Sequence, residues 1–180
     1  MSRLPIPLPT REYLNECLEY DGATGVLTWK VRPLKHFKNA HGMNTFNSNY
    51  AGQVAGNVSK RGYISVGIDA RSFLAHRVIW VLVTGEDPGN LLDHKDTDKS
   101  NNRWLNLRKA TKQQNGCNRG VPANSKTGIK GVSWDQARNK FFASISLNGK
   151  TKALGRFDSA DEARAAYAQA AKSLHGEFAK

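Results

Sequence analysis

Three short stretches decide the fold of this chain: Leu91-Leu92-Asp93-His94, then Asn102-Arg103-Trp104-Leu105-Asn106-Leu107-Arg108, then Gln114-Asn115. Counted from Asp93, Asn106 follows after 13 positions and Asn115 after 22. These side chains can hold one divalent cation beside one general base, because carboxylate and amide oxygens suit hard cations and an imidazole titrates near neutral pH. An isolated Asp-His pair is usually an ordinary turn, but the two Asn residues at these spacings favour a catalytic site.

The residues before this segment predict a run of short elements. Hydrophobic spacing and turn residues indicate a helix over 10–20 capped by Thr10, a strand over 26–31, a hairpin of 62–68 and 72–75, and a helix over 76–84 ended by Gly85. Residues 33–60 are rich in Asn, Gly, Lys and His with little periodicity, so we expect a long loop or arm there.

The pattern changes after a predicted linker over 120–127. Strands are expected over 129–134, 140–147 and 151–157, with Asn148-Gly149 as a hairpin turn, followed by an Ala-rich helix over 159–174 with Ser159 and Glu162 as a capping box. Along the middle strand Phe141, Ala143, Ile145 and Leu147 alternate with Lys140, Phe142, Ser144 and Ser146. The first set can pack on the helix, and the second set can meet a partner.

The charge of the chain indicates the class of that partner. The 180 residues carry a net charge of +12, which favours a polyanion, most often nucleic acid. Residues 126–156 hold seven Lys or Arg and one acid, whereas residues 157–180 hold three bases and four acids. The charge therefore belongs to the three strands, and a basic sheet of this size fits the DNA major groove.

Other classes are disfavoured. Cys17 and Cys117 are the only cysteines and form no C-x-x-C pair, so no structural zinc is expected. The first residues hold no apolar run of signal-peptide length, and the longest apolar run, residues 78–83, is far too short to span a membrane. We expect a cytoplasmic protein without a membrane partner.

Residues 60–119 resemble an HNH endonuclease of the phage and homing type, through the three opening stretches and Ala75-His76-Arg77-Val78-Ile79-Trp80. A weaker resemblance to phage-type lead-in segments covers Tyr20-Asp21-Gly22-Ala23-Thr24-Gly25-Val26-Leu27-Thr28-Trp29-Lys30. The family fold is a ββα-metal unit. It implies a strand over 91–94, a loop over 95–103, a second strand over 106–110 and a helix over 111–118.

The resemblance also implies roles. His94 would be the general base, Asn106 would orient it, and Asp93 and Asn115 would hold one Mg²⁺ or Mn²⁺ ion. Asn115 stands where many members carry His, which removes a nitrogen ligand and favours oxygen-loving ions. His76 is more easily explained as a packing residue than as a catalytic one.

The C-terminal segment resembles the plant Apetala-type (ethylene-response-factor) DNA-binding domain. The matching residues are Lys130-Gly131-Val132, Lys140-Phe141-Phe142-Ala143-Ser144-Ile145, Leu154-Gly155-Arg156-Phe157, Ala160-Asp161-Glu162-Ala163, Ala166-Tyr167, Ala170-Ala171 and Leu174-His175-Gly176-Glu177-Phe178. Ser144 and Ser146 replace a Glu and an Arg of the plant pattern, and Ala153 replaces a Trp, so the plant target sequence does not carry over. The DNA contacts predicted here are Lys130, Trp134, Arg138, Lys140 and Lys152. A solvated surface charge is the alternative for each lysine, and Trp134 could equally cover the edge of the core.

Together these features predict an α+β protein with an HNH nuclease domain over 1–119, a linker over 120–127 and a DNA-binding domain over 128–180. We expect a monomeric, phage-encoded homing-type enzyme that nicks double-stranded DNA in a bacterial host cell. The rival interpretation is a non-catalytic DNA-binding regulator with a degenerate HNH site, which Asn115 keeps open. A weaker rival is an RNA-binding protein, although a sheet that reads the major groove cannot enter the deep, narrow groove of RNA.

Overall fold

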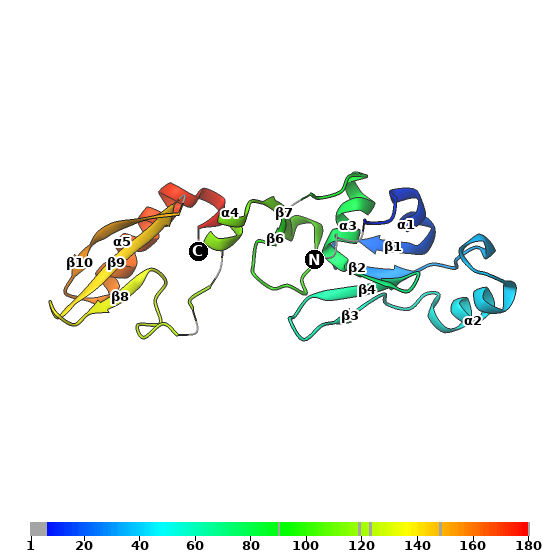
Figure 1. The fold of residues 1–180 in the computed structure, drawn as a ribbon, viewed down its shortest axis with the longest axis horizontal. Coiled ribbons are helices and arrows are strands. Elements are labelled where there is room, and N and C mark those ends of the chain that lie inside the picture. Colours follow the sequence, from blue (N-terminus) through cyan, green and yellow to red (C-terminus); the bar gives the residue numbers. More distant parts are fainter. Residues whose placement is uncertain (1–6, 90, 119, 123, 148, 180) are drawn as a thin grey trace, which may run out of the picture. The chain divides into compact units, whose positions relative to one another are not determined.

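The computed structural model describes residues 7–89, 91–118, 120–122, 124–147 and 149–179. The chain divides into two compact units, residues 1–109 and 110–180 (Figure 1). Helix α4 (Lys112–Cys117) groups with the second unit, where it packs on the 3₁₀ turn η3 (Gly176–Phe178). The predicted domain limits at 119 and 128 stay a prediction, since residues 119 and 123 lie outside the described residues.

The first unit holds three small sheets and three helices within its described part. In chain order its elements are α1 (Arg11–Cys17), β1 (Leu18–Asp21), β2 (Val26–Trp29), η1 (Leu34–His36), α2 (Ala40–Tyr50), β3 (Asn57–Val58), β4 (Ile64–Ile68), β5 (Arg71–Leu74), α3 (Ala75–Thr84), β6 (Leu91–His94), η2 (Trp104–Asn106) and β7 (Leu107–Ala110). The sheets are β1–β2, β3–β4–β5 and β6–β7. One core joins them, with Leu14, Val66, Val78 and Ile79 fully buried.

Several predicted elements of this unit are confirmed. Thr10 caps α1 by accepting a hydrogen bond from the Tyr13 amide, and α3 ends at Gly85 in the left-handed conformation. The helix predicted to reach residue 20 is wrong at its end. It stops at Cys17, because residues 18–21 pair with 26–29 as an antiparallel hairpin.

The prediction of an irregular loop over 33–60 is wrong, because the segment contains the 11-residue helix α2. No residue of α2 is fully buried, although Phe46 packs edge-on against the buried Trp29, with ring centroids 5.2 Å apart. Polar contacts add to this packing. The Asn47 side chain bonds the backbone N–H and C=O of Arg32 (2.9 and 3.0 Å), and the guanidinium of the 3% exposed Arg32 pairs with Asp69 (2.8 Å).

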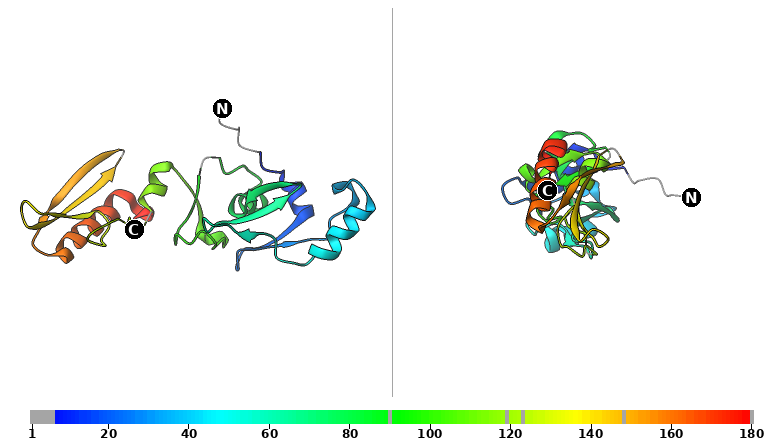
Figure 2. Two further views of the ribbon diagram at one scale, coloured as in Figure 1. Left: turned by 60° about the horizontal axis from the view of Figure 1, so that its bottom comes forward. Right: turned by 90° about the vertical axis from the view of Figure 1, so that its left-hand side faces the viewer.

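The second unit confirms the predicted three-stranded antiparallel sheet packed on one helix. Strands β8 (Val132–Asp135), β9 (Lys140–Leu147) and β10 (Lys150–Phe157) lie in the order β10-β9-β8. Helix α5 (Ala160–His175) covers one face (Figures 1 and 2). Ala143 and Ile145 of β9 are buried against this helix, as the alternation predicts. The expected turn residue Asn148 lies outside the described residues.

Among the residues described, no helix has the length and apolar character needed to cross a membrane.

Candidate functional site

The predicted catalytic pair lies at the buried end of β6. Asp93 is 5% exposed and His94 is 4% exposed. A charged or polar side chain this deeply buried costs free energy unless it is hydrogen-bonded or ion-paired. The partners come from the following loop and from β7.

His94 is held by Asn102, a residue for which the sequence predicts no role. The Nε2 atom of His94 lies 3.1 Å from Oδ1 of Asn102, which is only 1% exposed. An amide oxygen can only accept a hydrogen bond, so Nε2 must carry the proton. In an imidazole with its proton on Nε2, the lone pair lies on Nδ1.

Aromatic rings surround the imidazole of His94. His76, on α3, meets it edge-on with ring centroids 5.1 Å apart, and Tyr63 lies 6.1 Å from it. Burial, with the neighbouring His94 and Arg77, lowers the pKa of His76 to about 3. His76 is therefore neutral near pH 7. Its Nδ1 is buried without a hydrogen-bond partner among the described residues.

Asp93 forms a buried ion pair with Arg108 of β7. Both Nε and Nη2 of Arg108 donate to Oδ2 of Asp93, at 3.0 and 2.8 Å. The side chains are 9% and 6% exposed, so this pair is largely shielded from water. The two hydrogen bonds from one guanidinium fix the position of the carboxylate.

Asn106 fixes the loop that follows His94. Its amide nitrogen donates to Oδ1 of Asp96 (3.0 Å) and to the backbone oxygen of Asn101 (2.7 Å), and its Oδ1 accepts from the Asp96 amide (3.1 Å). Although burial raises the pKa of Asp96, hydrogen bonds from Asn106 and Asn101 outweigh it and hold the pKa below its ordinary value. Asp96 therefore remains a charged acceptor that closes the loop.

Asn115 lies on the short helix α4 in the second unit. Thr111 and Gln114 form a capping box at its start, with the Thr111 hydroxyl accepting from the Gln114 amide and the Gln114 side chain accepting from the Thr111 amide. The Asn115 amide bonds the Thr111 carbonyl at 2.9 Å. The side chain of Asn115 is partly exposed on this helix.

The face of the sheet opposite α5 carries a different set of side chains. Lys140 is paired with Asp158 (3.0 Å) at the start of β9. Further along, the guanidinium of Arg156 stacks over the ring of Phe142, 5.0 Å from its centroid, and its Nε donates to Asp135 (2.7 Å). These are exposed cations over an aromatic surface, a combination suited to phosphates and bases.

Arg156 reaches this face through a β-bulge. Ala153 pairs with Ser144, but Gly155 pairs with Ala143, so Leu154 is the extra residue. Simple alternation from Ala153 would place residue 156 on the helix side. Gly155 has φ +142°, and a Cβ there would lie 3.1 Å from the Phe157 ring, so glycine suits this position.

Two predicted DNA contacts lie on the helix side of the sheet by register. Trp134 pairs with Phe141 and meets its ring edge-on at 4.9 Å, although it remains 43% exposed. Lys152 pairs with the buried Ile145. Arg138 lies in the turn between β8 and β9, beside Asp135 (3.4 Å). Their contact with DNA stays a prediction.

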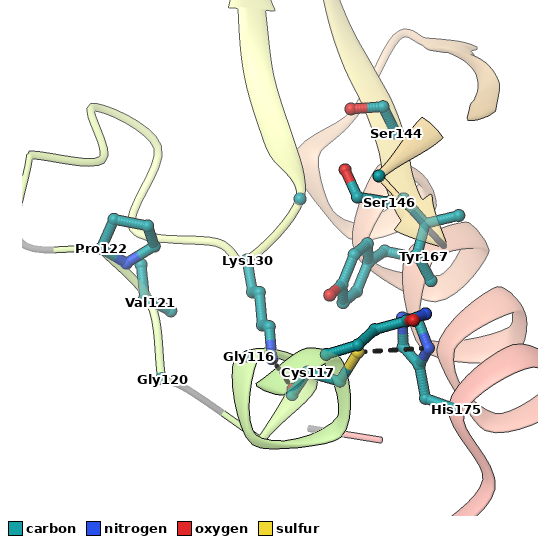
Figure 3. A pocket seen from close by; sticks show the side chains of 14 residues that line it. Gly116, Cys117, Gly120, Val121, Pro122, Lys130, Ser144, Ser146, Tyr167 and His175 are labelled. Carbon is teal, nitrogen blue, oxygen red and sulfur yellow. Dashed lines mark hydrogen bonds between the residues drawn. The ribbon is translucent and has the colours of Figure 1, made fainter. Parts of the chain in front are cut away.

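Lys130 lines a pocket of about 790 Å³ in the second unit (Figure 3). Its ammonium donates to the backbone oxygen of Cys117 at the end of α4. The Sγ atom of the same cysteine, Cys117, lies 3.4 Å from Nδ1 of His175 on α5. Burial raises the pKa of the Cys117 thiol, and it lowers the pKa of His175, so a neutral thiol faces a neutral imidazole.

Comparison with known proteins assigns both segments. Residues 73–117 match the family model described as HNH endonuclease, and residues 127–177 match the model described as AP2 domain. A curated relative, "Uncharacterized HNH endonuclease L560" of Acanthamoeba polyphaga mimivirus, is 36% identical over 124 residues, 68% of this chain. "Protein 3.8" of Escherichia phage T7 is 32% identical over 106 residues, 58% of this chain and 87% of its own length.

The chain carries an HNH endonuclease domain followed by an AP2 domain. It spans 63% of the length of the mimivirus relative. A solved structure of the HNH homing endonuclease I-HmuI, described as showing DNA binding and cleavage, is 22% identical over 88% of this chain and 85% of its own, with a TM-score of 0.40.

HNH endonucleases generally use a divalent metal ion, and the donors here fit a hard one. Within the described residues no three His, Cys, Asp or Glu side chains gather into a metal cluster. Mg²⁺ usually takes only one or two carboxylates and completes its shell with water and substrate phosphate, and Asp93 carries a carboxylate of the kind that would suit it.

Proposed function

We propose that this HNH family member is a metal-dependent DNA endonuclease of the homing type, which nicks one strand and is guided by its C-terminal AP2 domain. The observation that carries this proposal is the buried hydrogen bond from Nε2 of His94 to Asn102, next to the Asp93–Arg108 pair. An imidazole base held by a hydrogen bond, beside a carboxylate held by an arginine, is the minimum equipment for activating water at a phosphodiester.

In this proposal His94 removes the proton of the attacking water through Nδ1. Asp93 would hold one Mg²⁺ or Mn²⁺ ion, which would neutralise phosphate charge and stabilise the departing 3′ oxygen. Asn115 as a second ligand stays a prediction from the sequence. Arg108 holds the Asp93 carboxylate in place, and Asn106 orients His94 indirectly by closing the loop. Products would carry 5′-phosphate and 3′-hydroxyl ends. Because a monomer would have one base and one metal ion, it would cut one strand at a time.

DNA would meet the face of the sheet opposite α5. Lys140, Phe142 and Arg156 lie there, and two strands of such a sheet can enter the major groove. The surface ion pairs of Lys140 with Asp158 and of Arg156 with Asp135 are each worth roughly 0–1 kcal/mol, so phosphates can replace the carboxylates. Ser144 and Ser146 on the same strand can bond base edges without imposing one base.

The test is incubation of wild type, His94→Ala and His41→Ala with supercoiled phage or host DNA, in Mg²⁺, Mn²⁺ or chelator. His41 is an exposed histidine on α2 and serves as the matched control. We expect nicked circles from wild type and His41→Ala, only with metal, and none from His94→Ala. A gel shift should persist in all three proteins.

Wild-type protein that binds the same DNA at nanomolar concentration but never nicks it, with either metal, would favour the non-catalytic regulator instead. Nicking that survives in His94→Ala would remove His94 from the role of base. Duplex RNA competing as well as duplex DNA would count against groove reading by the sheet.

A further inference from the structure

Three contacts from the β1–β2 hairpin converge on residues 102–104 of the nuclease loop. The hydroxyl of Tyr20 donates to the backbone oxygen of Asn102 at 2.8 Å, and the amide of Trp104 donates to the backbone oxygen of Gly22 at 3.2 Å. Gly25 of the same hairpin lies directly against the backbone of Asn102 and Arg103. A Cβ at this residue would lie 2.5 Å from the Arg103 amide nitrogen and 2.6 Å from the Asn102 carbonyl carbon.

These contacts matter because no secondary structure holds the backbone of Asn102. Residues 101–103 belong to no helix or strand, so no ladder of backbone hydrogen bonds fixes them. Yet the Asn102 side chain is 1% exposed and lies 3.1 Å from Nε2 of His94. Its oxygen can select one tautomer of that imidazole only if its own backbone is fixed from elsewhere.

We propose that the β1–β2 hairpin is a positioning element of the nuclease site, in which Tyr20 and Gly25 fix the backbone of Asn102 and Asn102 fixes the imidazole of His94. The proposal rests on the proposed role of His94 as the base. It gives the lead-in segment, 65 or more residues before His94 in the chain, a part in aligning the reacting groups.

The chemistry of Tyr20 suits a permanent donor. Burial, together with the nearby carboxylate of Asp21, raises the pKa of Tyr20 to about 12 against the opposing effect of the Trp104 backbone hydrogen bond. The hydroxyl therefore keeps its proton throughout the pH range in which a histidine can act as base.

The decisive variant is Gly25→Ala, with Gly52→Ala as its control. Both glycines have nearly the same positive φ, +80° and +79°, so an alanine is strained equally at both. At Gly52 nothing lies within 4 Å of the added Cβ, whereas at Gly25 the methyl group must push the Asn102–Arg103 backbone away. We expect Gly25→Ala to lower the maximal nicking rate about 30-fold while duplex DNA binding stays within about twofold. Gly52→Ala should keep both within about threefold.

Tyr20→Phe tests the same link with a smaller change, which retains the ring and deletes only the hydroxyl. We expect a loss of about three- to tenfold in the maximal nicking rate, with Tyr50→Phe, whose ring is half exposed on α2, unchanged. Should Gly25→Ala fail to fold by thermal melting, Tyr20→Phe decides.

A second readout does not depend on cleavage. The ¹⁵N shifts of the histidine ring report which nitrogen carries the proton. In wild type and Gly52→Ala, His94 should be in the Nε2–H form near pH 7.5, and in Gly25→Ala its signals should move toward the average of both tautomers. An unchanged tautomer together with unchanged nicking in Gly25→Ala overturns the proposal. If wild type nicks no DNA but Gly25→Ala still alters the tautomer, the positioning link stands and the proposed function fails.

Discussion

The cluster around His94 and the exposed face of the AP2 sheet use polar residues in opposite ways. Asp93, His94, Asn102 and Arg108 are all less than 10% exposed, and each has an internal partner. On the sheet, Lys140 and Arg156 keep 41% of their side chains exposed and pair with the carboxylates of Asp158 and Asp135. Buried partners fix geometry and cannot be exchanged without cost, whereas surface partners can be exchanged for a ligand. The comparison suggests that chemistry needs the first arrangement and DNA binding the second.

The largest effect should come from removing one member of the buried pair. Arg108→Met would remove the cation that pairs with the buried Asp93 carboxylate, at a cost of roughly 3–5 kcal/mol in unfolding free energy. Urea denaturation measures this loss. Arg77→Met, which breaks the more exposed Arg77–Asp87 pair, should cost no more than about 1 kcal/mol. Equal losses of unfolding free energy in both variants would show that the buried pair stabilises the fold no more than the surface pair does.

A change of hydrogen-bond partner at His94 should affect rate more than stability. Asn102→Ala removes the acceptor of the Nε2 proton, so we expect the maximal nicking rate to fall about 100-fold. The control Asn44→Ala, on the exposed surface of α2, should nick at the wild-type rate. Single-turnover nicking with saturating DNA separates this loss from any change in binding. A wild-type rate in Asn102→Ala would show that His94 is aligned by other contacts.

The buried histidine next to His94 predicts an acid sensitivity. His76 has a folded pKa of about 3, below its ordinary value of 6.5, so acid protonates the unfolded chain first. Its contribution to stability is therefore complete above pH 6.5 and is lost as pH falls below that value. We expect about 2 kcal/mol less unfolding free energy at pH 5 than at pH 7 from this group. His76→Leu should flatten that part of the pH profile, and an equally steep profile in the variant would contradict the assignment.

On the sheet, smaller and additive effects are expected. Arg156→Ala should weaken duplex binding by about 1 kcal/mol and reduce the salt dependence by roughly one counterion. Lys152→Ala is the matched comparison, because Lys152 pairs with Ile145 and its side chain starts on the helix side. Binding titrations at several salt concentrations distinguish the two residues. A larger effect at Lys152 would mean that DNA approaches another surface of the domain.

The smallest effect concerns Lys130, which could bind DNA or support α4. Helix α4 has six residues, too few to be stable alone, and a cation at its last carbonyl contributes about 0.3–1 kcal/mol. Lys130→Met should therefore speed hydrogen exchange of the α4 amides several-fold and leave DNA affinity unchanged, while Lys140→Met does the reverse. Lost affinity with unchanged exchange in Lys130→Met would restore Lys130 as a DNA contact.

Much of the fold could be predicted because it depends on local pattern. The alternation along β9, the apolar stripe of α3 and its stop at Gly85 are confirmed at nearly the predicted residues. Helix α2 could not be predicted, since it buries no residue fully and depends on contacts of its Asn47 and Phe46 with Arg32 and Trp29, which lie outside the helix. The contact of Gly25 with the Asn102 backbone also escaped prediction, because it joins residues 77 or more positions apart.

The sequence by itself determined the family, most of the elements and residue types suited to cutting and binding DNA, because these follow from spacing, periodicity and charge. Only the tertiary structure decided which partner each buried polar group has: Asn102 for His94 and Arg108 for Asp93. It also decided that Arg156 shares a face with Phe142, because the bulge at Leu154 and Gly155 reverses the alternation. The physical reason is the same in each case. A buried hydrogen bond or a strand register depends on where distant segments meet, and no local pattern encodes that meeting.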